Sequence, residues 1–279
     1  MIVVTNPVLE VTTTIGCPVA CVYCPQKALR NTYAHRSGAS KSMSLVDFEV
    51  YLSSVPTSVD VHFSGYSEPW SNADCTEMIR HSVGKGHRTA IFTTLALTTI
   101  ADLMQLNEWQ LKRFVVHLPD MDGLMPIKNI KKYTEKLAAL ASLSRIPAEF
   151  MAIGRVHPEC AAIVESIRED RTCLTRVDNL SPEQLDRARQ SHVVSRSNLV
   201  RHHGPIACMK NRTYQNVLLP DGTVTLCCMD YSMSEVIGNL RSVSYTSLHD
   251  NAQFRSVRDA MLSNDGDVIC RKCEWALPA

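Results

Sequence analysis

The chain has 279 residues, of which 45% are hydrophobic, 20% charged and 6% aromatic. This composition suits one large folded domain, or one with an appendage, and argues against a disordered chain or a coiled coil. With 29 Lys and Arg against 28 Asp and Glu, the net charge of +1 gives no bulk attraction to nucleic acid or to an anionic membrane surface, and we expect neither as a partner.

Up to about residue 178, short β-rich runs alternate with longer segments of helical period, a pattern typical of βα units around a parallel sheet. The predicted strands are Leu9–Thr13, Val59–Ser64, Thr89–Thr94, Arg113–Leu118, Glu149–Arg155 and Leu174–Val177. The predicted helices are Ser44–Ser54, Ala73–Val83, Ile100–Gln105, Ile127–Ser142 and Pro158–Glu169, followed by a short charged helix at Ser181–Gln190. Six strand–helix repeats predict an α/β fold that forms a barrel or part of one.

Three predicted helices carry signals at their ends. Ser44 and Asp47 are spaced as in a capping box at a helix start. Gly84 is placed to end its helix in a left-handed conformation. Pro126 stands at a favourable first-turn position of the helix that follows it.

The regular period is lost in the C-terminal part, from about His202 to Ala279. There Pro220-Asp221-Gly222 predicts a hairpin between Tyr214–Leu219 and Thr223–Cys227, with a helix at Phe254–Leu262 later on. A segment this small and irregular buries too little apolar surface to be stable alone. We expect a metal or the main domain to stabilise it. We therefore expect two domains, a barrel at residues 1–200 and a small hairpin-and-helix domain at residues 201–279.

Eleven cysteines are the outlier of the composition, and they suit either a secreted disulfide protein or a metal protein made in a reducing compartment. The first ten residues, MIVVTNPVLE, lack the basic and apolar regions of a signal peptide. No apolar stretch is as long as the about 20 residues that a membrane-spanning helix needs. We expect a cytoplasmic protein whose cysteines are metal ligands or small apolar residues.

Three of these cysteines, Cys17, Cys21 and Cys24, form the pattern C-x3-C-x2-C directly after the first predicted strand. Three thiolates on one tight loop can each bind one iron of a cubane [4Fe-4S] cluster and leave the fourth iron open. The alternatives are three unrelated thiols or a structural zinc site. A zinc site would need a fourth ligand nearby, where His35 is the only histidine.

With the aromatic Tyr23 just before its last cysteine, this motif resembles that of the radical S-adenosylmethionine (SAM) enzymes. The resemblance implies a partial (βα)6 TIM-like barrel in which SAM chelates the open iron of the cluster. Reductive cleavage of SAM then gives a 5′-deoxyadenosyl radical, which abstracts a hydrogen atom from the substrate. A reducing partner such as flavodoxin or ferredoxin is implied as well.

The end of the second strand, Ser64-Gly65-Tyr66-Ser67-Glu68, is similar to the glycine–glutamate motif that receives the SAM ammonium group in that family. Glycine allows close backbone approach, and a carboxylate pairs with a cation. The usual double glycine is replaced here by Ser64-Gly65, and an ordinary surface loop is the alternative.

The ends of later strands are where a barrel presents functional side chains. By position, SAM or substrate contacts are expected from Thr93, Thr94, His117, Arg155 and Arg176, with Arg155 a candidate catalytic residue. A hydrogen-bonded barrel histidine and surface ion pairs of the two arginines are the alternatives.

A second cysteine group reads Cys208-x13-Gly222-x4-Cys227, then Cys228, then Cys270-x2-Cys273. A hairpin and a terminal turn can bring four of these thiols to one zinc ion or one fully ligated [4Fe-4S] cluster, and spacing alone does not choose. The pattern resembles the shortened SPASM, or twitch, domain that follows many radical SAM barrels, which implies an auxiliary [4Fe-4S] cluster and two clusters in total.

Only one of Cys227 and Cys228 is expected to be a ligand, because neighbouring side chains on a strand point to opposite faces. The glycine spacing favours Cys227 and leaves Cys228 as a buried apolar residue or a reactive thiol. The remaining cysteines, Cys75, Cys160 and Cys173, are expected to be structural.

In twitch-bearing relatives that dehydrogenate aminocyclitols, the auxiliary cluster accepts the electron left on the substrate radical. The resemblance therefore implies oxidation of a sugar or aminocyclitol carbinol to a ketone. Modification of a ribosomally made peptide is one alternative. Redox-neutral epimerisation of a sugar or peptide, with Cys228 as hydrogen donor, is another, and a non-catalytic iron–sulfur or zinc protein is a third.

Overall fold

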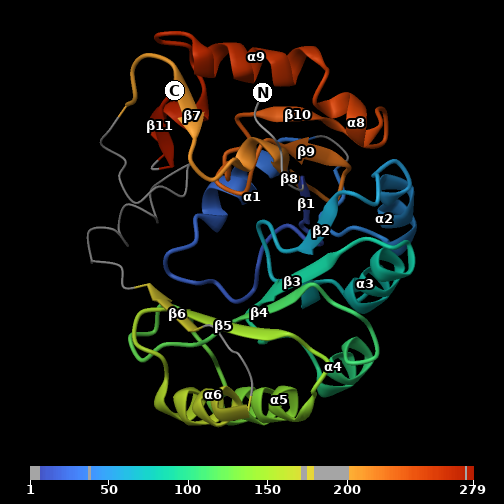
Figure 1. Ribbon diagram of the computed structural model, residues 1–279, viewed down its shortest axis with the longest axis vertical. Coiled ribbons are helices and arrows are strands. Elements are labelled where there is room, and N and C mark those ends of the chain that lie inside the picture. The colour runs from blue at the N-terminus through green and yellow to red at the C-terminus, as the bar shows by residue number, and fades with distance from the viewer. Residues whose placement is uncertain (1–6, 37–38, 171–174, 179–200, 274) are drawn as a thin grey trace.

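The computed structural model describes residues 7–36, 39–170, 175–178, 201–273 and 275–279 (Figure 1). Within these residues six parallel strands lie side by side in chain order. They are β1 (Val8–Val11), β2 (Asp60–Phe63), β3 (Thr89–Thr93), β4 (Arg113–His117), β5 (Ala148–Ile153) and β6 (Thr175–Asp178). All six overlap the strands predicted from the sequence, which confirms the α/β fold.

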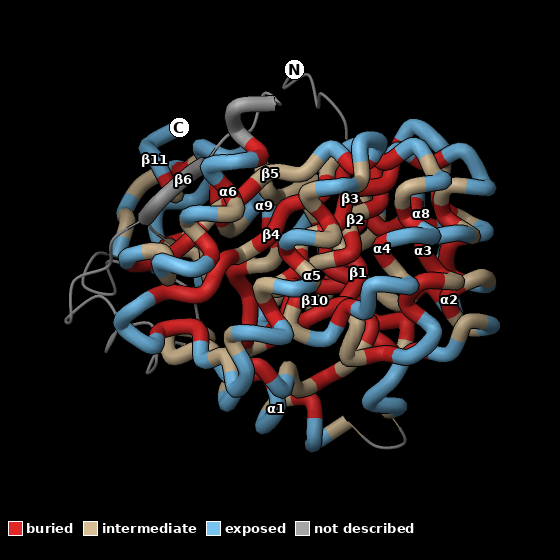
Figure 2. Tube along the Cα trace, turned by 90° about the horizontal axis from the view of Figure 1, so that it is seen from below, coloured by how far each residue is buried: buried red, intermediate tan, exposed pale blue. Residues whose placement is uncertain are grey.

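Helices cover the outer face of this curved sheet (Figure 1). They are α2 (Leu45–Leu52), α3 (Cys75–Gly84), α4 (Ile100–Leu106), α5 (Ile130–Ser142) and α6 (Pro158–Asp170), whereas α1 (Gln26–Ala34) follows the first cysteine loop. Figure 2 shows buried residues along the strands and exposed ones on the outside of the helices. Because side chains alternate along a strand, Leu9 and Val11 pack outward under the helices, and Glu10 points to the inner face.

The helix ends agree with the sequence in one case of three. Ser44 Oγ accepts the N–H of Asp47 (3.1 Å), so the predicted cap of α2 is confirmed. The prediction for Gly84 is wrong, since Gly84 is the last helical residue of α3 and Gly86 takes the left-handed conformation (φ +87°). The predicted start at Pro126 is also wrong, because Asn129 Oδ1 accepts the N–H of Lys132 and begins α5 there.

Helix α1 was not among the predicted helices, although it buries Leu29 and Tyr33. The predicted helix Ser181–Gln190 and Cys173 lie outside the described residues.

The C-terminal segment is joined to the barrel through the sheet itself. Its strands are β7 (Ile206–Cys208), β8 (Gln215–Leu218), β9 (Thr223–Thr225), β10 (Val236–Asn239) and β11 (Ala276–Pro278), with helices α8 (Tyr245–Leu248) and α9 (Ala252–Leu262). The predicted hairpin is present as antiparallel β8 and β9. Strand β8 also pairs in parallel with β1, so the described sheet has nine strands in the order β10-β9-β8-β1-β2-β3-β4-β5-β6.

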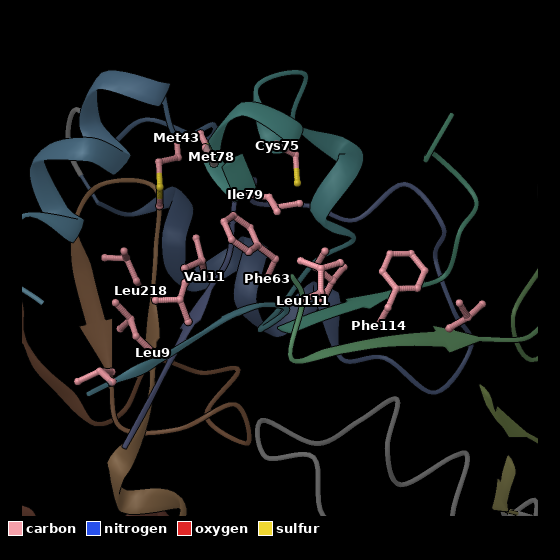
Figure 3. Close-up of a cluster of buried hydrophobic side chains, with 14 of the residues drawn as sticks. Leu9, Val11, Met43, Phe63, Cys75, Met78, Ile79, Leu111, Phe114 and Leu218 are labelled. Carbon is pink, nitrogen blue, oxygen red and sulfur yellow. The ribbon is translucent and has the colours of Figure 1, made fainter. Parts of the chain in front are cut away.

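The hydrophobic core also extends from the barrel into the C-terminal segment. Leu218 of β8 lies beside Leu9 and Val11 of β1 in the core cluster (Figure 3). Thr12 N–H donates to the carbonyl of Leu218 (2.9 Å). Barrel and C-terminal strands therefore share one core, and the main domain is part of what holds the C-terminal segment. No helix among the described residues is long and apolar enough to cross a membrane.

Candidate functional site

The three cysteines of the first motif lie on the loop between β1 and α1 and face one cavity of about 200 Å³. The loop turns sharply at Gly16 (φ +96°) and Ala20 (φ +55°), and Cys24 N–H donates to the carbonyl of Cys21 (3.0 Å). These turns bring Cys17, Cys21 and Cys24 to the same side. The sequence predicted this grouping of thiols, and the structure assembles it.

Gly65 lines the same cavity at the end of β2. Its φ is +76°, and a Cβ there would lie 2.4 Å from Thr12 Oγ1, so a larger residue does not fit. The next residue, Tyr66, donates its N–H to the same Thr12 Oγ1 (3.0 Å). Glycine is thus required here for a tight turn that also borders the cavity.

Glu68 is buried and lines the same cavity. Its Oε1 accepts the hydroxyl of Thr93 (2.6 Å), and its Oε2 accepts the N–H (2.7 Å) and hydroxyl (2.6 Å) of Thr94. Burial raises the pKa of Glu68, and these hydrogen bonds offset part of that rise. These hydrogen bonds from Thr93 and Thr94 therefore fix the Glu68 carboxylate between the ends of β2 and β3.

The far side of the cavity comes from β3, β4 and β5. His117 Nδ1 and Tyr23 Oη are hydrogen-bonded (3.2 Å), which ties the cysteine loop to β4. Phe92, Val115 and Met151 give this side an apolar surface. Such a surface suits a flat, partly apolar ligand such as a nucleoside.

The structure does not bring all the candidates to the cavity. Arg155 is 69% exposed and pairs with Asp122 on the surface (Nη2 to Oδ1, 2.7 Å), which is the surface ion pair considered as its alternative. Arg176 lies on β6 opposite Met151 in the strand register. Its side chain is outside what the structure describes.

Besides the apolar residues, four polar or aromatic residues that line the cavity were not candidates from the sequence: Gln26, Tyr66, Ser67 and Tyr231. Gln26 Nε2 donates to the Tyr66 carbonyl and to Cys24 Sγ (3.6 Å). Tyr231 comes from the C-terminal segment, and its hydroxyl lies 3.6 Å from Cys24 Sγ. No local pattern marks a tyrosine that reaches the site from 207 positions along the chain.

The C-terminal cysteines form a second group around a separate, largely apolar pocket. It is lined by Cys208 at the end of β7, Cys227 after β9, and Cys270 and Cys273 around the short helix η3 (Ile269–Lys272). Cys228 is not among the lining residues. Its Sγ accepts a hydrogen bond from Arg212 Nη1 (2.9 Å), and Glu10 of β1 lies on its other side.

Both groups of thiols suit metal ligation by their donor chemistry. Burial raises the pKa of the Cys21 thiol to about 12 and raises the pKa of Cys17, Cys24, Cys227 and Cys270 as well. A bare thiolate is unfavourable in such surroundings, whereas a bound metal stabilises it. The ten cysteines of the described part form no disulfide bonds. In that part no three His, Cys, Asp or Glu side chains meet closely enough for a single metal ion.

The barrel and the C-terminal segment meet beside these sites. The single O–H of Tyr66 is shared between the carbonyls of Cys227 and Asp230 (both 2.9 Å from Oη), and its ring packs against Tyr231 (centroids 4.6 Å apart). The strand end that borders the first cavity is therefore bonded to the segment that carries the second group of thiols.

Comparison with known proteins agrees with this arrangement. Residues 208–274 match the SPASM family, described as an iron-sulfur cluster-binding domain. No curated protein matches the sequence.

Several solved structures share the fold. BtrN in complex with AdoMet and 2-DOIA has a TM-score of 0.56 and 15% identity, over 93% of this chain and 88% of that one. The anSMEcpe structure with bound AdoMet and Cp18Cys peptide gives 0.60 and 15%, over 96% and 86%. Streptococcus suis SuiB bound to precursor peptide SuiA gives 0.57 and 12%, over 91% and 67%.

The fold and the domain match define the class, a partial α/β barrel with a C-terminal iron–sulfur domain. The match at residues 208–274 and the shared fold agree with the resemblance to radical SAM enzymes with a SPASM-type domain that the cysteine motifs indicate.

Proposed function

We propose that the chain is a radical SAM enzyme that cleaves SAM reductively and takes a hydrogen atom from its substrate, oxidising a sugar or aminocyclitol carbinol to a ketone. The observation that carries this proposal is the presence of two separate thiol groups connected through Tyr66 and Tyr231. When bound, a cluster at Cys17, Cys21 and Cys24 supplies the electron that cleaves SAM, and one at Cys208, Cys227, Cys270 and Cys273 accepts the electron from the substrate.

The residues around the first cavity have the chemistry to bind and orient SAM. Glu68 offers a fixed carboxylate for its ammonium group, with Thr93 and Thr94 holding that carboxylate in place. The turn at Gly65 gives a ligand close access to the backbone. Tyr23 and His117 fix the cysteine loop against β4, and the apolar surface of Phe92 and Met151 excludes water from an adenosyl group. Arg176, by its position on β6, is proposed as a further contact.

We propose the division of labour inferred from the sequence, with SAM cleavage in residues 1–200 and the auxiliary cluster in residues 201–279. Support for the small-molecule substrate comes from BtrN, whose structure holds AdoMet and 2-DOIA. The anSMEcpe and SuiB structures contain peptides, so a peptide substrate is the competing assignment. The proposal also includes a reducing partner, a flavodoxin or ferredoxin, that delivers single electrons to the protein.

The test is anaerobic reconstitution with iron and sulfide, reduction with dithionite, and detection of 5′-deoxyadenosine. With a panel of sugars and aminocyclitols, we expect ketone and 5′-deoxyadenosine in equal amounts. Cys17→Ser should abolish both products, whereas Cys270→Ser should keep SAM cleavage and lose the ketone. Zinc instead of iron in the reconstituted protein, or the absence of 5′-deoxyadenosine, would contradict the proposal. If only peptides gave products, the substrate would be a peptide and not a sugar or aminocyclitol.

A second candidate, redox-neutral epimerisation, is favoured by the position of Cys228. Its thiol is turned away from the four-cysteine pocket, toward Glu10 and Arg212, and is therefore free of the ligand set. For an epimerase, Cys228→Ala and Cys228→Ser should stop product formation while SAM cleavage continues, with deuterium from solvent in the wild-type product. For the oxidase proposed above, both variants should still form ketone.

A further inference from the structure

The charge of the segment around the first cysteine loop is one-sided. Residues 11–46 contain Lys27, Arg30, Arg36 and Lys41 and no Asp or Glu, in a chain whose net charge is only +1. Arg36 is paired, since its Nε donates to Asp221 Oδ2 (2.9 Å). The other three have no acidic partner in the described part of the chain.

The structure gathers these three side chains at one surface pocket of about 680 Å³. Lys27, Arg30 and Lys41 are exposed and line it, with the loop from Ile15 to Pro18 as its base. The Arg30 side chain runs along Gly16, with its Cδ 3.8 Å from where a Cβ of Gly16 would lie. We call Lys27, Arg30 and Lys41 the basic rim.

Cys17 connects this outer pocket with the inner cavity, because it lines both. On one side it stands with Cys21, Cys24 and Glu68, and on the other side with the basic rim. Only the thickness of one loop therefore separates the proposed catalytic thiols from this surface.

We propose that the basic rim docks an acidic one-electron carrier protein, which delivers the electron at the Cys17 side of the loop. This inference rests on the proposed function, because it supplies the electron that reductive cleavage requires. In each encounter the carrier is oxidised by one electron and the catalytic centre is reduced by one, with no bond formed or broken. Three unpaired cations around a hollow attract an acidic surface and raise the rate of productive encounter.

The test compares two triple variants with the same change in net charge. In the first, Lys27→Glu, Arg30→Glu and Lys41→Glu reverse the basic rim. In the control, Lys128→Glu, Lys131→Glu and Lys132→Glu reverse exposed lysines just before and in the first turn of α5, a helix on the outer face of the sheet (Figure 1). Each protein is assayed for 5′-deoxyadenosine with dithionite and, separately, with a prereduced acidic flavodoxin or ferredoxin.

The rim variant should lose about tenfold or more of kcat/KM for the protein carrier at low salt, and the control should not. With dithionite, both variants should match the wild type. The wild-type rate with the carrier should fall toward that of the rim variant near about 1 M salt, where the Debye length is about 3 Å. Equal losses in both variants, no loss in either, or a loss with dithionite would overturn the proposal.

A binding measurement keeps this inference separate from the proposed function. Quenching of flavodoxin fluorescence on titration with the purified protein reports docking without any turnover. If dithionite gives no SAM cleavage, the proposed function fails, while salt-sensitive binding lost only in the rim variant still supports the docking surface. Binding that survives rim reversal contradicts it.

Discussion

His62 is a largely buried histidine on the inner face of β2, and its ring is tilted by 40° against that of Phe92 (ring centroids 5.5 Å apart). In the described part of the chain its Nε2 has no hydrogen-bond partner. Burial lowers its pKa to about 4, and the nearby Lys112 adds to this effect. The inner face of the barrel therefore holds a neutral imidazole.

The lowered pKa of His62 predicts that this one residue makes the folded protein less stable in acid. Below about pH 6.5 the unfolded chain binds a proton at His62 that the folded protein does not, so the protein loses about 1.4 kcal/mol of stability per pH unit as the pH falls toward 4. His62→Phe should remove this loss. The measurement is the unfolding midpoint of both proteins, anaerobically, at about pH 7 and about pH 5.

Acid effects shared by the two proteins, such as loss of bound iron, cancel in that comparison. The exposed His35, changed to Phe, is the control and should keep the wild-type acid sensitivity. An unchanged acid response in His62→Phe would contradict the assignment.

At the scale of the element, η3 owes its position to a single buried arginine between two proposed ligands. Arg271 is 1% exposed and stands between Cys270 and Cys273. Its guanidinium makes five hydrogen bonds of 2.6–2.9 Å to backbone carbonyls, those of His202, Gly204, Ala260, Ser263 and Gly266. The C-x2-C turn is thereby fixed to α9 and to the chain before β7.

We predict that Arg271→Gln loosens this turn, destabilising the protein by about 3 kcal/mol or more because several buried carbonyls lose their donor. Iron held by the C-terminal cysteines should be lost before iron at the first motif. Iron content and the thermal midpoint measure the two effects, with the exposed Arg258→Gln on α9 as control. Arg271→Lys should be only a partial rescue, since an ammonium cannot reproduce the planar set of donors. Full iron content in Arg271→Gln would argue against this role.

The elements also show what the sequence could predict. The six strands were found because β-rich runs alternate locally with helical segments, and the cysteine motifs because their spacing is local too. Helix α1 was missed, since only Leu29 and Tyr33 mark its buried face. The pairing of β8 with β1, and the arrival of Tyr231 at Cys24, depend on contacts between distant parts of the chain that no local pattern contains.

At the scale of the whole molecule, the sheet makes the C-terminal segment part of the barrel. Strand β8 covers the edge of β1, and Val217 and Leu219 share a buried cluster with Ile15, Leu29 and Tyr33. Without that segment β1 would present an unpaired edge beside exposed apolar side chains, which favours aggregation.

We predict that a chain ending at residue 200 is insoluble or aggregated, as measured by size-exclusion chromatography. The full-length double variant Cys270→Ser, Cys273→Ser is the control, because it removes two proposed ligands and keeps the sheet. It should remain a soluble monodisperse protein with lower iron content. A soluble, folded chain of residues 1–200 would show that the barrel does not need β8.

The neighbourhood of β1 and β8 also sets an order of events during synthesis. The strand beside β1 and the tyrosine at Cys24 are translated about two hundred residues after the first cysteine loop. Contacts so far apart in the chain form late in folding. The proposed iron–sulfur site at Cys17, Cys21 and Cys24 therefore gains its contact with Tyr231 only after the C-terminal segment has been made.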